Sequence, residues 1–107
     1  MPAISRDVVD LAKTGHGCTA FIGVKASQGV VLANNIPVLR IGDRCLPHTL
    51  PVGPFCKPHS SKVNMGSPTV FAKGIPIGRR WDSTDFGFLL GASPNVYANG
   101  GGQKGSL

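Results

Sequence analysis

The chain has 107 residues, enough for one small domain, and its 15 glycines and 9 prolines exclude long helices and favour short strands joined by tight turns. It carries 11 basic and 5 acidic residues, for a formal net charge of +6. No basic run is longer than Arg79-Arg80 and no aromatic residues alternate with the basic ones, so the charge indicates a basic surface rather than a dedicated nucleic-acid site.

The N-terminal segment has no targeting signature. Residues 1–11 lack the charged region and the apolar core of a secretory signal, and no apolar stretch approaches the roughly 18–20 residues that cross a bilayer. Residues 7–13 alone have some helical character, but a segment this short is marginal as a helix. We expect it to be extended or a turn.

A weak repeat organises the middle of the chain. Residues 31–43 and 70–82 match position for position at an offset of 39 residues, and a truncated third copy follows at 93–100. Each full copy predicts a strand, a turn and a return strand, because Asn34-Asn35 and Lys73-Gly74 tolerate positive φ. The proline in each return strand cannot donate to a ladder, so these strands should lie at an edge.

An arginine recurs at one position of the repeat. Arg40 and Arg79 each follow an Ile-Pro pair. We expect them to bind backbone carbonyls or to pair with Asp43 and Asp82.

Four potential metal ligands lie in predicted turns that contain glycine or proline: His16, His48, Cys56 and His59. Nitrogen and sulfur donors in this number suit a closed, tetrahedral, structural Zn²⁺ site. Iron, copper and nickel also accept imidazole-rich sites. The prolines of the predicted ligand loop should stiffen it by fixing φ; they are Pro47, Pro51, Pro54 and Pro58.

Three cysteines are an odd number, which excludes a complete internal disulfide framework. Cys18 and Cys45 are most simply packing residues, and either could replace Cys56 as a ligand. Cys45 is the second choice for that position.

Several motifs occur together in a characteristic order. They are Thr14-Gly15-His16-Gly17-Cys18, Ile36-Pro37 leading to Arg40-Ile41-Gly42-Asp43, Pro47-His48, Cys56-x-x-His59 and Gly-Ser-Pro-Thr-Val-Phe at 66–71. In this order they resemble the PAAR-repeat domain over about residues 3–100. The resemblance implies one spike-tip domain at 1–100. The glycine-rich composition of residues 101–107 predicts a flexible tail.

The resemblance also implies an architecture and a role. The expected fold is all-β, a small conical structure of short strands, hairpins and loops with one metal ion near the vertex. His16, His48, Cys56 and His59 fall where the ligands of the family lie. Such domains are non-enzymatic tips of contractile injection systems, in phage tails or type VI secretion.

The implied partner is a trimeric β-helical spike, VgrG-like or a phage central spike, whose blunt end one monomer caps and sharpens. The tip would contact the target cell envelope transiently and bind no nucleic acid. Its place would be the phage tail tip, or the bacterial cytoplasm before export by the injection machine.

With three similar strand edges, one asymmetric chain could bind three identical subunits at once. The residues expected to bind the spike belong to the first strand of each copy: Val31, Leu32, Val70, Phe71, Val96 and Tyr97.

Two other function classes remain open. A small zinc-stabilised nucleic-acid-binding module suits the positive charge, although no helix follows the ligand pair. A metal-assisted hydrolase would need a free coordination position and a general base, for which Asp82 and Asp85 are candidates.

Overall fold

A computed structural model of the chain describes residues 2–98. The predicted tail at 101–107, and positions 99 and 100 of the third repeat, lie outside the described residues. The fold is all-β, as predicted, and the described residues contain no helix. The body is elongated, measuring 42 × 27 × 24 Å along its principal axes.

Residues 2–98 form ten short strands. They are β1 (Leu11–Lys13), β2 (Phe21–Lys25), β3 (Leu32–Ala33), β4 (Ile36–Pro37), β5 (Arg44–Cys45), β6 (His48–Val52), β7 (Phe55–His59), β8 (Phe71–Ala72), β9 (Ile75–Pro76) and β10 (Phe88–Leu89).

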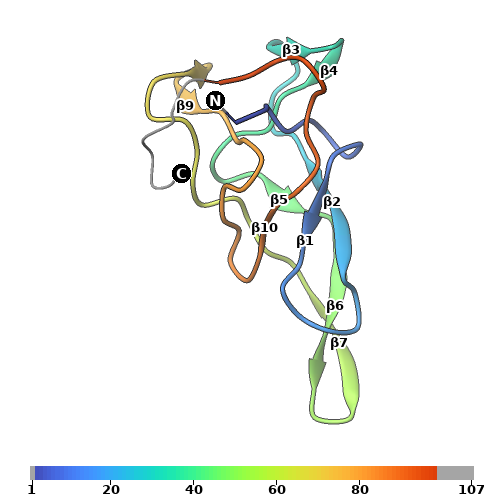
Figure 1. Ribbon diagram of the computed structural model, residues 1–107. Helices are drawn as coiled ribbons and strands as arrows, with labels where there is room; N and C mark the ends of the chain where they lie inside the picture. Colours follow the sequence, from blue (N-terminus) through green and yellow to red (C-terminus); the bar gives the residue numbers. More distant parts are fainter. Residues whose placement is uncertain (1, 99–107) are drawn as a thin grey trace.

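The strands form one sheet and three ribbons. The sheet is antiparallel with the order β10-β1-β2-β5, and the two-stranded ribbons are β3–β4, β6–β7 and β8–β9. Figure 1 shows β3, β4 and β9 at the broad end of the molecule, the sheet in its middle, and the β6–β7 ribbon alone at the narrow end. The body therefore tapers toward a single hairpin.

The two full sequence repeats fold as equivalent hairpins. Leu32 pairs with Pro37 in the first, and Phe71 pairs with Pro76 in the second. Each ribbon has only two strands, so both prolines stand at an edge as predicted.

The turns of these hairpins use the left-handed backbone conformation that the sequence predicts. The φ angles are 55° at Asn34, 66° at Asn35, 51° at Lys73 and 82° at Gly74. Asparagine and glycine adopt this region at low cost, which explains why these residue types close the turns.

The third copy is divided between the two ends of the chain. Residues 93–98 supply its first half and residues 3–10 its second, joined by the bridge between Tyr97 and Ala3. The Ile4 amide donates to the Val96 carbonyl at 2.9 Å. The equivalent bonds of the two full copies run from the Val38 amide to the Val31 carbonyl at 3.1 Å and from the Ile77 amide to the Val70 carbonyl at 3.0 Å.

A closed ring of backbone hydrogen bonds joins the three copies. The Leu39 amide donates to the Ser5 carbonyl (3.0 Å), the Ser5 amide to the Gly78 carbonyl (3.1 Å), and the Gly78 amide to the Leu39 carbonyl (2.8 Å). The broad end thus has approximate three-fold symmetry within one chain.

The core of the broad end repeats in the same way. One small and one β-branched side chain from each copy make up this core: Ala33, Ala72, Ala98, Val38, Ile77 and Ile4. All six are at most 5% exposed. A second core lies beneath the four-stranded sheet: Ala12, Val24, Leu39, Cys45, Val63 and Leu89.

Each copy also buries a carboxylate that binds the backbone amide of its arginine. The distances are 2.9 Å from Arg6 N to Asp10 Oδ2, 2.8 Å from Arg40 N to Asp43 Oδ2, and 2.8 Å from Arg79 N to Asp82 Oδ2. These bonds close one loop of each copy in the same way.

The arginine side chains behave as predicted. The Arg79 guanidinium forms a buried ion pair with Asp82 at 3.0 Å, and Arg40 donates to the Ala72 carbonyl at 3.2 Å.

The start of each copy is held by a side-chain oxygen. Ser67 Oγ accepts from the Val70 amide and Ser93 Oγ from the Val96 amide, both at 3.0 Å. In the first copy, where the sequence has no serine at this position, Gln28 Oε1 accepts from the Val31 amide at 2.8 Å. The longer glutamine thus replaces serine without displacing the strand.

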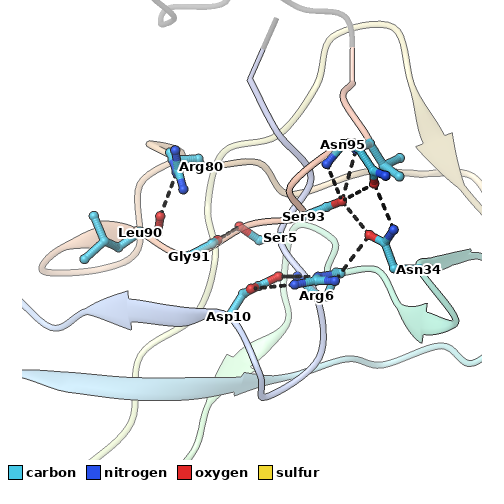
Figure 2. Close-up of polar contacts among 10 residues, drawn as sticks. Ser5, Arg6, Asp10, Asn34, Arg80, Leu90, Gly91, Ser93 and Asn95 are labelled. Atoms are coloured by element: carbon cyan, nitrogen blue, oxygen red, sulfur yellow. Dashed lines mark hydrogen bonds and ion pairs between the residues drawn. The ribbon is translucent and has the colours of Figure 1, made fainter.

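A polar seam joins the divided copy to the first one (Figure 2). Asn34 donates to Asn95 Oδ1 at 2.8 Å and accepts from the Arg6 guanidinium at 3.2 Å, while Ser93 Oγ also donates to Asn34. Next to these contacts, Ser5 Oγ donates to the Gly91 carbonyl at 2.7 Å. Both ends of the chain are therefore tied into the broad end by side chains as well as by backbone.

Candidate metal centre

The first histidine of the candidate site stands on the loop between β1 and β2. The loop closes because the Thr14 amide donates to the Ala20 carbonyl at 2.9 Å, and the buried Thr14 hydroxyl donates to the same carbonyl at 3.1 Å. Gly15 has φ of 81°, and a Cβ there would lie 1.9 Å from the Phe86 carbonyl oxygen. Only glycine fits this position, and it directs His16 toward the β6–β7 hairpin.

The other two histidines face each other across that hairpin. His48 is the first residue of β6 and His59 the last residue of β7, and the two are direct partners in the ladder. Residues 48–59 were expected to form a proline-stiffened loop. They form an antiparallel ribbon of five residue pairs instead. Its prolines are tolerated because a two-stranded ribbon leaves one side of each strand without a ladder partner.

The three imidazole rings form one cluster. The ring of His16 stacks on that of His48 with centroids 5.2 Å apart, and the centroid of His59 lies 5.1 Å from the first ring and 4.9 Å from the second. One ring nitrogen from each histidine lies within 4.8 Å of the other two. Nitrogens on one tetrahedral Zn²⁺ are about 3.4 Å apart at the usual bond length, so small side-chain rotations would suffice to bind an ion.

Backbone carbonyls fix the tautomer of two of these rings. Nδ1 of His16 lies 2.9 Å from the Gly17 carbonyl, and Nδ1 of His48 lies 2.8 Å from the Leu46 carbonyl. A carbonyl only accepts, so Nδ1 carries the proton and Nε2 presents its lone pair. A second hydrogen bond of this kind is typical of histidines that bind metal.

The Nε2 atoms of all three rings are buried and have no hydrogen-bond partner. A buried polar atom without a partner costs about 1–3 kcal/mol, so the three together cost on the order of 3–9 kcal/mol. An ion bound at the centre of the cluster would remove this cost. The donor set therefore fits a transition metal that accepts imidazole nitrogen.

The electrostatics of the cluster favour the neutral form of His59. Burial lowers the pKa of His59 from its ordinary value of 6.5, the neighbouring His48 and His16 lower it further, and Asp85 partly opposes them. Neutral imidazole is the form that binds metal. The ring of Phe86 borders the cluster, 5.1 Å from His59 and 5.9 Å from His16.

Cys56, the fourth predicted ligand, is not part of the cluster. Its Sγ forms a disulfide with Cys18 Sγ, so it is no thiolate. Successive side chains of a strand point to opposite faces, and Cys56 is three residues from His59. It therefore faces the other side of the hairpin, where Thr49 Oγ1 lies 3.1 Å from Thr19 Oγ1. The prediction of a three-histidine, one-cysteine site was wrong for the cysteine.

Cys45, the second choice for the sulfur ligand, lies in the core beneath the sheet. It is 3% exposed and accepts a hydrogen bond from Ser61 Oγ at 3.1 Å. Burial raises the pKa of its thiol, which keeps the sulfur protonated at neutral pH. Its predicted packing role is confirmed. The prediction of simple packing failed for Cys18, whose disulfide the odd cysteine count did not suggest.

The six residues expected to bind a partner divide into two classes. Leu32, Phe71 and Tyr97 are 47%, 51% and 51% exposed at equivalent positions of the three copies. The valines before them pack against the core of the broad end: Val31, Val70 and Val96. An outward-facing apolar triad remains at the broad end.

Comparison with models of known protein families and with curated proteins gives no match for this sequence. Among the described residues, no helix has both the length and the apolar character needed to span a membrane.

Proposed function

We propose that the protein is a non-enzymatic tip that caps the blunt end of a trimeric β-helical spike in a contractile injection system, of a phage tail or of type VI secretion. The observation that carries this proposal is the approximate three-fold symmetry of the broad end. A single chain can match a three-fold partner only by presenting three similar surfaces. The closed ring of bonds among Ser5, Leu39 and Gly78 supplies that symmetry.

The apolar triad is the proposed docking surface. Leu32, Phe71 and Tyr97 each come from the first strand of one copy and are about half exposed. Each lies in a ribbon or bridge with a free edge, so a spike subunit can add main-chain hydrogen bonds beside the apolar contact. One monomer would then cap one trimer.

The narrow end is the proposed penetrating end. Four residue pairs of the β6–β7 ribbon project past the pair formed by His48 and His59, a reach of about 13 Å at the usual strand rise. A hairpin alone is marginally stable in water. Two cross-links would support it: the proposed ion at the histidine pair, and the disulfide from Cys18 to Cys56, which lies three pairs further along the ribbon.

Zinc is the ion that best fits a structural role in this cluster, and iron is the alternative. Structural Zn²⁺ contributes on the order of 10–16 kcal/mol in small peptides, as much as the net stability of a domain. Such cross-links suit a point that meets the target cell envelope under load. The effect of the protein is mechanical, and it needs no catalytic group.

Binding to a trimeric spike tests the proposal directly. The purified protein is mixed with a trimeric β-helical spike from an injection system, and the complex is sized by light scattering after gel filtration. We expect one chain per trimer. The triple variant L32D/F71D/Y97D should lose the complex, and each single variant should weaken it.

The matched control carries the same change at the other end of the molecule. Phe55 at the apex is 65% exposed, so Phe55→Asp should leave spike binding intact. All of these side chains are about half exposed or more, so the variants should keep the fold, which their melting temperatures check. Equal binding by the triple variant and the wild type would contradict the docking surface.

A further inference from the structure

We propose that the ion held by His16, His48 and His59 keeps a fourth coordination position open to a small anion from solvent. This inference rests on the metal site of the proposed function. It differs from the closed site expected from the sequence, in which a protein thiolate occupies that position.

The donor inventory of the described residues leads to this conclusion. The cluster that could hold an ion contains three histidines and no cysteine or carboxylate. Tetrahedral zinc takes four ligands, and three protein ligands leave one position for an exogenous group. The fourth ligand must then come from outside the cluster.

Neither Cys56 nor Cys45 can supply the fourth ligand in this fold. Cys56 is bonded to Cys18 on the opposite face of the hairpin. Cys45 is buried in the core beneath the sheet, with its sulfur bound to Ser61.

The acidic group that influences the cluster is also committed elsewhere. Asp85 influences His59 electrostatically, but its two carboxylate oxygens accept from the Lys62 amide at 3.3 Å and from Asn64 Nδ2 at 3.4 Å. These bonds hold the carboxylate toward residues 62–64 rather than on the cluster.

Charge selects the class of ligand. Three neutral imidazoles leave the full double charge of a divalent ion, whereas a thiolate would cancel half of it. The buried nitrogens and the bordering Phe86 ring restrict the ligand to a few atoms. A small anion fits both the charge and the space.

Cobalt spectroscopy with azide as the probe tests the inference. The metal-free protein, with its disulfide intact by mass spectrometry, is loaded with Co²⁺. We expect no thiolate-to-cobalt charge-transfer band and a saturable change of the visible cobalt bands on adding azide. The double variant C18A/C56A should give the same spectra, and His59→Ala should weaken cobalt binding by more than about 100-fold, since even second-shell changes cost 10–100-fold.

The possible failures are distinguishable. A thiolate band in the wild type that disappears in C18A/C56A would overturn the inference, and a cobalt spectrum indifferent to azide would do the same. Either result leaves the spike-tip proposal intact, because that proposal is decided by the spike-binding experiment. Failure to bind cobalt at all would overturn the inference and remove the ion from the proposed function as well.

Discussion

Loss of the disulfide should destabilise the metal-free protein strongly. The bond joins Cys18 and Cys56 across a sequence separation of 38 residues. Closing a loop of this length removes chain entropy from the unfolded state worth about 4 kcal/mol. For a domain of this size, that corresponds to a fall in melting temperature of about 15–30 °C. Calorimetry of the wild type and of C18A/C56A without reductant measures the difference.

Reductant supplies the internal control for this prediction. It should lower the melting temperature of the wild type to that of C18A/C56A and leave the variant unchanged. Cys45→Ala removes the third cysteine but not the bond, so this variant should keep its sensitivity to reductant. A melting temperature that does not respond to loss of the bond would refute the reasoning about loop closure.

Three further predictions concern single sites. Gly15→Ala should reduce metal affinity measured by calorimetric titration, because a Cβ 1.9 Å from the Phe86 carbonyl forces the β1–β2 loop to move; unchanged affinity would contradict the role of this loop. Asp82→Asn should lower the free energy of unfolding, measured by chemical denaturation, by about 3 kcal/mol, because Arg79 is only 1% exposed and would lose its carboxylate partner. An unchanged free energy of unfolding would show that the ion pair is dispensable. The metal-free protein should lose stability as pH falls below 6.5, because the lowered pKa of His59 lets the unfolded state take up its proton first. The loss should level off once the pH is below the folded pKa, and His59→Gln should flatten this part of the pH profile.

The sequence predicts the local structure of the repeats well, because the determinants are local. Positive φ at Asn34 and Gly74 follows from residue types that tolerate it, and the offset of 39 residues gives the second hairpin once the first is recognised. The extended or turn conformation expected for residues 7–13 is confirmed, with turn residues leading into β1. The paired role of Arg79 and Asp82 also follows from their spacing in the repeat.

The union of the chain ends could not be predicted in the same way. Residues 3–10 and 93–98 each resemble only half of a repeat, and their partnership depends on a bridge between Ala3 and Tyr97. Gln28 hides a further equivalence, since its longer side chain accepts the hydrogen bond that serine accepts in the other two copies.

The grouping of the three histidines is confirmed, and the placement of Cys56 beside them was wrong. The spacing Cys56-x-x-His59 suggests a ligand pair when the segment is taken as a loop. In a strand, an odd spacing separates the two side chains onto opposite faces. The sequence therefore placed the site on the right segment, and the error came from the secondary structure assigned to it.

The copy shared between the chain ends has a consequence for biosynthesis. The amide of Ile4 leaves the ribosome long before its acceptor on Val96 is made. Contacts this distant in sequence slow folding. The β6–β7 hairpin can form while translation continues, but the face with three-fold symmetry must wait for residues 93–98. A nascent chain would thus form its narrow end before its proposed docking surface, which delays assembly until these residues have been made.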